Sequence, residues 1–195
     1  MKHLVIMAKA PEAGRVKTRL ARQIGVAEAT RVYRTMLGQA LRNLGRDPRW
    51  HTWVAVAPDT HISSPVWPSH VLLVAQGAGD LGDRMQRMFD VLPRGKVLII
   101  GSDVPNISAH EIADGFKCLG AHDAVFGPAH DGGYWLVGQK RFPRILDVFE
   151  NVRWSSEHTL QDSVANLEGR KIGYLNTRRD LDTESEYRAW LRGVL

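Results

Sequence analysis

Residues 3–20 read HLVIMAKAPEAGRVKTRL, a short apolar run followed directly by a charged loop. The run His3–Ala8 predicts a buried β-strand, and Pro11 and Gly14 favour a stiff turn whose backbone can approach a ligand closely. In an open α/β sheet, the loop after the carboxyl end of a strand borders the crevice in which ligands usually bind. This loop is therefore the first candidate functional segment.

The cations of this loop predict the binding of a polyanion, with the phosphates of a nucleotide as the first candidate. Lysine and arginine form strong charge-assisted hydrogen bonds to phosphate oxygens. A solvated basic loop is the alternative, and it is the better interpretation of an arbitrary Lys/Arg cluster. The position directly after the first strand favours binding. The phosphate-binding candidates are Lys9, Gly14, Arg15, Lys17 and Arg19.

Size and composition indicate one domain spanning residues 1–195, with 44% hydrophobic residues to build its core. The formal charge of +5 favours an acidic ligand. Nucleic acid is not expected as a partner, because the cations form no tail or long run. The single cysteine, Cys118, excludes an intramolecular disulfide. No apolar run is long enough to span a bilayer, so we expect a cytoplasmic protein of undetermined oligomeric state.

Strand-like and helix-like patterns alternate along the chain, which predicts a mostly parallel sheet covered by helices on both faces. Residues 58–68 read as a surface loop. Further strands are expected at 52–57, 71–74, 97–101, 124–127, 134–137 and 172–175, and helices at 26–44, 81–92, 109–119, 156–167 and from 183 onward.

A second motif, GSDVP, follows the most hydrophobic strand and places Asp103 at its carboxyl end. A carboxylate there is close to the ligand crevice and is costly to leave unpaired. Asp103 is therefore a candidate ligand for Mg²⁺ or Mn²⁺ bridging to a phosphate. The alternative is a turn or helix-capping aspartate ahead of Pro105.

Asp180 and Asp182 form a third acidic motif before the last helix. In an extended segment alternate residues face the same side, so both carboxylates can converge on one site and join Asp103 around a metal ion. The alternative is an ordinary helix start, in which Asp182 or Thr183 is the N-cap.

Two glycine-rich loops complete the candidate set. Asp131, Gly132 and Gly133 stand in a turn between two strand-like runs, and the glycines could expose N–H groups to an acceptor substrate. A structural hairpin turn is the favoured alternative on spacing alone. The second loop, QGAGDLGDRM, covers residues 76–85, and its Gly79 and Arg84 could bind a nucleotide. The alternative is an ordinary loop in which Asp80 is the N-cap of the following helix.

Other chemistries find little support. The chain has no P-loop motif, no GxSxG nucleophile motif and no histidine or cysteine spacing typical of a zinc site.

Together, MAKAPEAGRVKTRL, QGAGDLGDRM, GSDVP, GPAHDGGYWLVG and LDT resemble a family of GT-A-like proteins described as "transferase 1" or DUF2064-type glycosyltransferases. That family is related to the nucleotide-diphospho-sugar transferases, including the molybdenum-cofactor and 2-phospho-lactate guanylyltransferases. The resemblance covers nearly the whole chain with its motifs in order. The N-terminal loop differs from the glycine-rich loop of the molybdenum-cofactor enzymes, so their substrates are not carried over.

The resemblance implies a Rossmann-like three-layer α/β/α sandwich with a mostly parallel, mixed sheet. It also implies a nucleoside triphosphate or nucleotide sugar as donor, and dependence on Mg²⁺ or Mn²⁺. By position, the basic loop would hold phosphates, Asp103 with Asp180 and Asp182 would hold the metal, and Gly132 and Gly133 would face the acceptor.

These observations predict a metal-dependent transferase that uses a nucleotide-activated donor. The favoured reaction is nucleotidyl transfer to a small anionic acceptor, because an anionic acceptor needs no catalytic base. Lys17 and Asp103 are the expected catalytic residues. A glycosyltransferase and a non-catalytic nucleotide-binding module are the alternatives.

Overall fold

The computed structural model describes all residues, 1–195. Strands and helices alternate as the sequence predicts, and most predicted boundaries lie within a few residues of those observed. In chain order the elements are β1 (Lys2–Lys9), α1 (Thr18–Ile24), α2 (Val26–Gly45), β2 (His51–Ala57), η1 (Asp59–His61), β3 (Leu72–Ala75), α3 (Leu81–Val91), β4 (Lys96–Ile100), α4 (Ala109–Cys118), β5 (Ala124–Pro128), β6 (Tyr134–Gln139), α5 (Thr159–Ala165), β7 (Ile172–Tyr174) and α6 (Glu184–Leu191).

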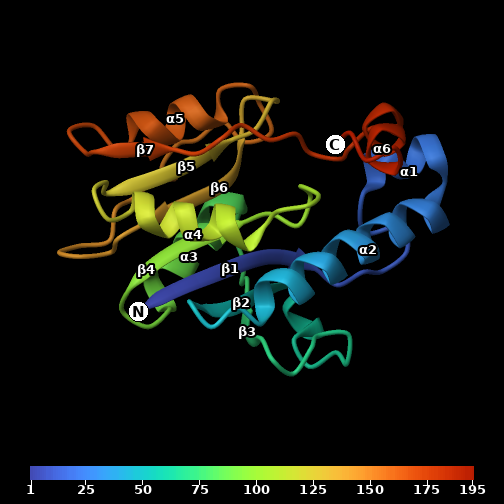
Figure 1. Ribbon diagram of the computed structural model, residues 1–195, viewed down its shortest axis with the longest axis horizontal. Helices are drawn as coiled ribbons and strands as arrows, with labels where there is room; N and C mark the ends of the chain where they lie inside the picture. Colours follow the sequence, from blue (N-terminus) through green and yellow to red (C-terminus); the bar gives the residue numbers. More distant parts are fainter.

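The seven strands form one sheet in the order β3-β2-β1-β4-β6-β5-β7 (Figure 1). Strand β6 is antiparallel to both of its neighbours, β4 and β5, whereas the other pairs are parallel. The prediction of a mostly parallel, mixed sheet is therefore confirmed.

Helices cover both faces of this sheet because successive strand residues point to opposite sides. In β1, Leu4 and Ile6 pack in a core with residues of α2 and α4. Val5 and Met7 pack in a second core with residues of α3, and Leu160 and Val164 of α5 pack against this core. The result is the three-layer α/β/α sandwich that the family resemblance implies.

A third, smaller core joins the beginning of the chain to its end. Leu20 of α1 and Leu181 are fully buried in it together with residues of α2, and Tyr187 and Trp190 of α6 pack against it. Figure 1 shows α6, in red, beside α1, in blue. This small core fixes the position of the acidic segment before α6 relative to the basic loop after β1.

The structure corrects the sequence-based boundaries in three places. The basic loop is shorter than predicted, because α1 begins at Thr18 and carries Arg19 on its first turn. The helix expected from 156 begins at Thr159. The loop at 58–68 contains the short 3-10 helix η1.

The topology gathers the sequence motifs at one edge of the sheet. Strands β1, β3 and β4 are parallel and end at that edge, so the loops that follow Lys9, Ala75 and Ile100 emerge there together. Antiparallel β6 begins at the same edge, where Leu136 pairs with Ile100, so the DGG turn before it also lies there. This edge is where open α/β sheets bind ligands.

Replacing Leu98 by alanine tests the main core. Leu98 is fully buried in β4, so Leu98→Ala should lower the free energy of unfolding by about 2–5 kcal/mol through lost burial and the cavity it leaves. The matched control is Leu72→Ala in β3, where the side chain is 45% exposed and the cost should be below about 1 kcal/mol. Urea denaturation measures both. Equal losses would contradict this packing.

Candidate functional site

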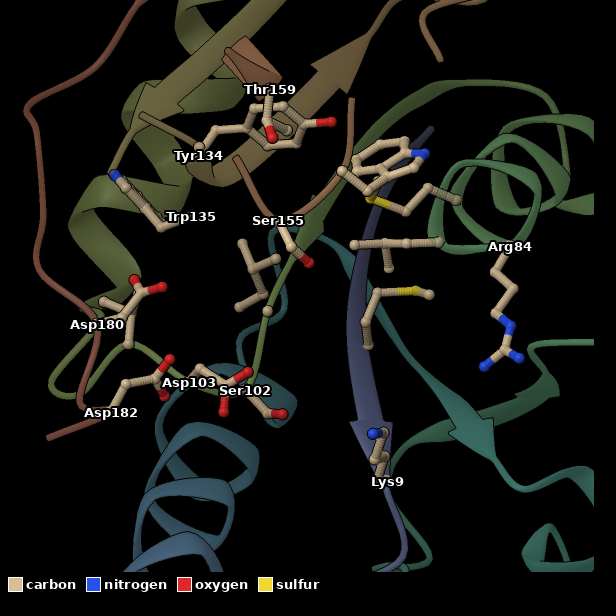
Figure 2. Close-up of a pocket in the computed structure, with 18 of the residues that line it drawn as sticks. Lys9, Arg84, Ser102, Asp103, Tyr134, Trp135, Ser155, Thr159, Asp180 and Asp182 are labelled. Atoms are coloured by element: carbon tan, nitrogen blue, oxygen red, sulfur yellow. The ribbon is translucent and has the colours of Figure 1, made fainter. Parts of the chain in front are cut away.

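A cleft of about 780 Å³ opens at this edge of the sheet (Figure 2). Its walls come from the basic loop, the glycine-rich loop before α3, the GSD segment, the DGG turn and the acidic segment before α6. Two of the predicted site residues, Gly14 and Gly132, do not line it. Those that do are Lys9, Arg15, Lys17, Arg19, Gly79, Arg84, Asp103, Asp131, Gly133, Asp180 and Asp182.

Lys17 is the centre of the charged end of the cleft. Its Nζ lies 2.7 Å from Asp103 Oδ1 and 3.0 Å from Asp182 Oδ1, and its side chain is only 2% exposed. Burial alone would lower the pKa of Lys17, but the two carboxylates outweigh it and the pKa is raised. The ammonium therefore stays protonated and holds two acidic segments that are far apart in the sequence.

The local backbone directs Lys17 inward. Lys17 is the N-cap of α1 and has left-handed backbone angles, with φ 48° and ψ 44°. Val16 on one side and Leu20 on the other are buried in different cores. Arg15 and Arg19, in contrast, have side chains more than 70% exposed and only longer ion pairs, to Glu12 at 3.4 Å and to Asp182 at 3.8 Å.

Leu181 fixes the two late aspartates. Its side chain is fully buried and its N–H donates to the Asp103 carbonyl at 3.1 Å. Because this segment is extended, Asp180 and Asp182 project together into the cleft on the side of Asp103 (Figure 2). Thr183, and not Asp182, is the N-cap of α6, where it forms a capping box with Glu186. Because Asp182 does not cap the helix, its carboxylate can pair with Lys17.

Asp180 carries a buried polar atom that has no partner in the chain. Its Oδ1 is buried without a hydrogen-bond partner. Burial, together with the charges of Asp131, Asp103 and Asp182, raises the pKa of Asp180 to about 7. A buried carboxylate oxygen that faces other carboxylates and receives no donor fits a cation site built from hard oxygen ligands.

The predicted metal ligands are not already assembled around one point. No group of three or more histidine, cysteine, aspartate or glutamate side chains has the arrangement of a metal site. The ammonium of Lys17 lies between Asp103 and Asp182, which accounts for part of this separation. The donor set suits Mg²⁺ or Mn²⁺, and binding would require these side chains to rearrange.

Tyr33, which no sequence motif indicated, joins the segments after β1 and β4. Tyr33 of α2 is buried; its hydroxyl accepts from the Lys9 N–H at 2.9 Å and donates to the Lys9 carbonyl at 3.0 Å. It also lies 3.3 Å from Ser102 Oγ. Burial raises the pKa of Tyr33 to about 12, so the phenol stays neutral. A tyrosine on the apolar face of a helix requires a polar partner, which was the available signal.

The glycine-rich loop before α3 is held by its own hydrogen bonds. Asp80 caps α3 in a capping box with Asp83, so the structural alternative for Asp80 is confirmed. Gly79 has a positive φ of 101°, and a side chain there would collide with Asp83. Arg84 Nε donates to the Gly79 carbonyl at 3.1 Å. The buried Gln76, which sequence analysis did not select, donates to the Ala55 carbonyl at 2.8 Å.

The DGG turn corrects one expectation. The N–H of Gly132 donates to the Ala129 carbonyl and that of Gly133 to Asp131 Oδ1, at 3.3 and 2.9 Å, so neither is free for an acceptor. Gly132 does permit a close approach, but to the backbone of Glu157. The turn is therefore built as the structural alternative proposed, while Asp131 and Gly133 still line the cleft.

A further wall of the cleft was also missed. Residues 154–157, which precede α5, and Thr159, the first residue of α5, also line the cleft. Residues 154–157 carry no motif and form no helix or strand, so their sequence gives no sign that they face the cleft.

The fold is shared with several solved structures. A protein of Desulfovibrio desulfuricans G20, provisionally described as a nucleotide-diphospho-sugar transferase, superposes with a TM-score of 0.87 at 28% identity over 98% of this chain and 87% of that one. A 4-diphosphocytidyl-2C-methyl-D-erythritol synthase from Anaerococcus prevotii DSM 20548 gives 0.66 at 11% identity, covering 98% and 96%. The manganese complex of Rv0371c from Mycobacterium tuberculosis H37Rv gives 0.55 at 16%, covering 99% and 98%.

The structure contains no helix with the length and apolar character of a membrane span. A comparison with curated protein sequences finds no match. Residues 40–156, more than half of the chain, match the family described as "Uncharacterized protein conserved in bacteria (DUF2064)". The chain therefore belongs to the DUF2064 family and has the fold of the nucleotide-diphospho-sugar transferases.

Proposed function

We propose that the protein is a metal-dependent transferase that uses a nucleotide-activated donor, and that its reaction is nucleotidyl transfer from a nucleoside triphosphate. The observation that carries this proposal is the charge arrangement of a single cleft. Exposed cations that could bind phosphates line this cleft together with a cluster of carboxylates, and the buried Lys17 pairs with two of those carboxylates.

The cations of the cleft suit a triphosphate. All of the lysines and arginines that line it come from the end of β1, the loop after it, the start of α1 or α3. Arg15 and Arg19 are exposed, and the side chain of Lys9 forms no ion pair, so these charges can turn toward a ligand. In Figure 2, Lys9 and Arg84 lie on the opposite side of the pocket from the aspartates. An extended anion could therefore contact both groups.

Asp103, Asp180 and Asp182 would hold Mg²⁺ or Mn²⁺. When bound, such an ion would neutralise charge on the phosphates and on the leaving group. The partnerless oxygen of Asp180 supports this assignment, since a cation would satisfy it. The manganese complex of Rv0371c, which has the same fold, is consistent with it.

In the proposed reaction, an acceptor oxygen attacks the α-phosphorus while the bond to the bridging oxygen breaks and pyrophosphate leaves. Lys17 would stabilise the negative charge that develops on pyrophosphate, because its ammonium is buried, protonated and fixed at the acidic end of the cleft. Tyr33 would act as a positioning residue, since it ties Lys9 to the Ser102 segment beside Asp103.

Glycosyl transfer is the second candidate. It is favoured by the description of the Desulfovibrio desulfuricans protein as a nucleotide-diphospho-sugar transferase. In that case the same cations and metal would hold the nucleoside diphosphate that leaves the sugar. The two reactions differ in product, which is pyrophosphate in one and a nucleoside diphosphate in the other.

The donor can be identified by thermal shift with nucleoside triphosphates and nucleotide sugars, each with and without Mg²⁺ or Mn²⁺. A ligand at about a hundred times its Kd adds about 2.7 kcal/mol of stability. For a protein of this size the Tm should rise by about 5–10 °C. Asp103→Asn should remove the metal-dependent part of that rise. The matched control, Asp114→Asn on α4 outside the cleft, should retain it.

A shift with a triphosphate and release of pyrophosphate would support nucleotidyl transfer. A shift with a nucleotide sugar alone would favour glycosyl transfer. A metal-dependent shift without release of either product would indicate a binding module, and the absence of any shift would contradict the proposed donor site.

Asp180→Asn should separate stability from metal binding. The pKa of Asp180 in the folded chain, about 7, lies above the ordinary 3.8, so ionisation opposes folding increasingly from about pH 4 to pH 7. Without metal, the variant should therefore be more stable by about 1–3 kcal/mol at pH 7.5. It should also lose most of the stabilisation by Mn²⁺. Asp114→Asn should change neither. A less stable Asp180→Asn protein with normal Mn²⁺ binding would show that Asp180 has a structural role.

A further inference from the structure

The cleft is divided by charge, and its second half carries no cation. We define the acceptor wall as the cleft-lining residues of segments 131–137 and 154–159. It contains the carboxylates of Asp131 and Glu157, several hydroxyl groups and aromatic side chains, among them Trp154. No lysine, arginine or histidine of these segments lines the cleft. An anion at this wall would find acidic residues and no cationic partner.

The two arginines next to this wall are already paired. Arg178, whose guanidinium lies 6.0 Å from the centre of the Trp135 ring, forms an ion pair with Glu111 at 2.6 Å and does not line the cleft. Arg153 binds Asp162 through Nε and Nη2, at 2.9 and 2.7 Å, and does not line the cleft. The exposed cations of the basic loop lie in the other half, where the triphosphate of the proposed donor would engage them. The wall therefore offers hydrogen-bond acceptors, hydroxyls and ring faces, but no charge that would attract a phosphate or carboxylate.

Ser155 is an exposed residue of this wall that carries a hydroxyl group. It has a positive φ of 56°, a conformation that non-glycine residues rarely adopt and that is often associated with functional sites. Figure 2 shows its hydroxyl facing the open centre of the pocket. Its neighbours hold the segment in place: Ser156 Oγ donates to the Arg153 carbonyl at 2.7 Å, and Thr159 Oγ1 donates to the same carbonyl at 2.9 Å. The Ser155 hydroxyl itself makes no hydrogen bond within the chain.

We infer that the acceptor is an uncharged molecule rich in hydroxyl groups, a sugar or a polyol, and that Ser155 positions it against the acceptor wall. Hydroxyls that both donate and accept match the carboxylates and Ser155, and an apolar ring face of a sugar can lie against an aromatic side chain. This inference rests on the proposed transferase function. It replaces the small anionic acceptor expected from the sequence.

An uncharged acceptor must lose the proton of its attacking hydroxyl group during the reaction. The acceptor hydroxyl oxygen forms the new bond to the α-phosphorus, pyrophosphate leaves with the electrons of the broken P–O bond, and the hydroxyl proton must pass to a base. Asp131 can receive it, because Oδ1 accepts from Gly133 while Oδ2 makes no hydrogen bond within the chain.

Matched acceptors test the charge of the substrate. With the donor found by thermal shift, product formation is measured for uncharged sugars and polyols and for their phosphorylated forms, such as glucose with glucose 1-phosphate and glycerol with glycerol 3-phosphate. Glucosamine represents a cationic acceptor. The best uncharged compound should react at least ten-fold faster than its phosphorylated form. Preference for a phosphorylated compound or an amine would overturn the inference, as would donor binding without use of any uncharged acceptor.

A donor that fails to bind would instead overturn the proposed function, so the two failures are distinguishable.

Variants of Ser155 test its positioning role. Ser155→Ala and Ser155→Gly should each raise the acceptor KM about three- to ten-fold, the effect of one hydrogen bond, while the donor KM stays unchanged. Glycine adopts the positive φ without strain, so it separates the hydroxyl from the backbone. Ser69→Ala, at an exposed turn outside the cleft, is the matched control. An unchanged acceptor KM, or an effect of alanine alone, would overturn the role of the hydroxyl.

Discussion

The buried ammonium of Lys17 is the interaction on which the arrangement of the site depends. A charge removed from water is stable only when it is paired, and the partners of Lys17 come from the segment after β4 and the segment before α6. Leu181 reinforces the same connection through its buried side chain and its hydrogen bond to Asp103. The beginning, middle and end of the chain are thereby fixed around one point.

Lys17 and its carboxylate partners lie in a cleft that has two chemically different halves. One half carries exposed cations from the loop after β1 and from α3, while the other carries carboxylates, hydroxyls and aromatic rings. The division suits a reaction in which a charged donor and an uncharged acceptor meet at the acidic cluster. The raised pKa of Asp180 and its oxygen without a hydrogen-bond partner support the proposed cation site in this cluster.

Much of the site could be predicted because the sheet topology brings the loops that carry the motifs to one edge. Once His3–Ala8 and the VLII run of β4 are identified as parallel strands, their following loops must emerge at one edge, which brings Lys17 and Asp103 close together. The alternation around Leu181 likewise anticipates that Asp180 and Asp182 face one side. Local sequence signals are also sufficient for the start of α4, where Ser108 and Glu111 form a capping box.

The remainder depends on contacts that local sequence patterns do not encode. That Lys17 pairs with both Asp103 and Asp182 depends on the packing of α1 against α6. The close approach of Gly132 to Glu157 depends on how the segment before α5 packs against the DGG turn. The local sequence does not show this contact, so Gly132 was predicted to approach an acceptor substrate instead. Ser155 lies in an irregular stretch whose position is set by its neighbours' hydrogen bonds. Such features follow from the assembled tertiary structure.

The most direct test of this account is a crystal structure with Mn²⁺ and a non-hydrolysable nucleoside triphosphate, in which anomalous scattering locates the metal. We expect Mn²⁺ to contact phosphate oxygens together with carboxylates of Asp103, Asp180 or Asp182, and the Lys17 ammonium to turn at least partly toward the phosphates. A nucleotide bound away from Lys17, or Mn²⁺ bound without any of these aspartates, would contradict the assignment of this cleft as a metal-dependent transferase site.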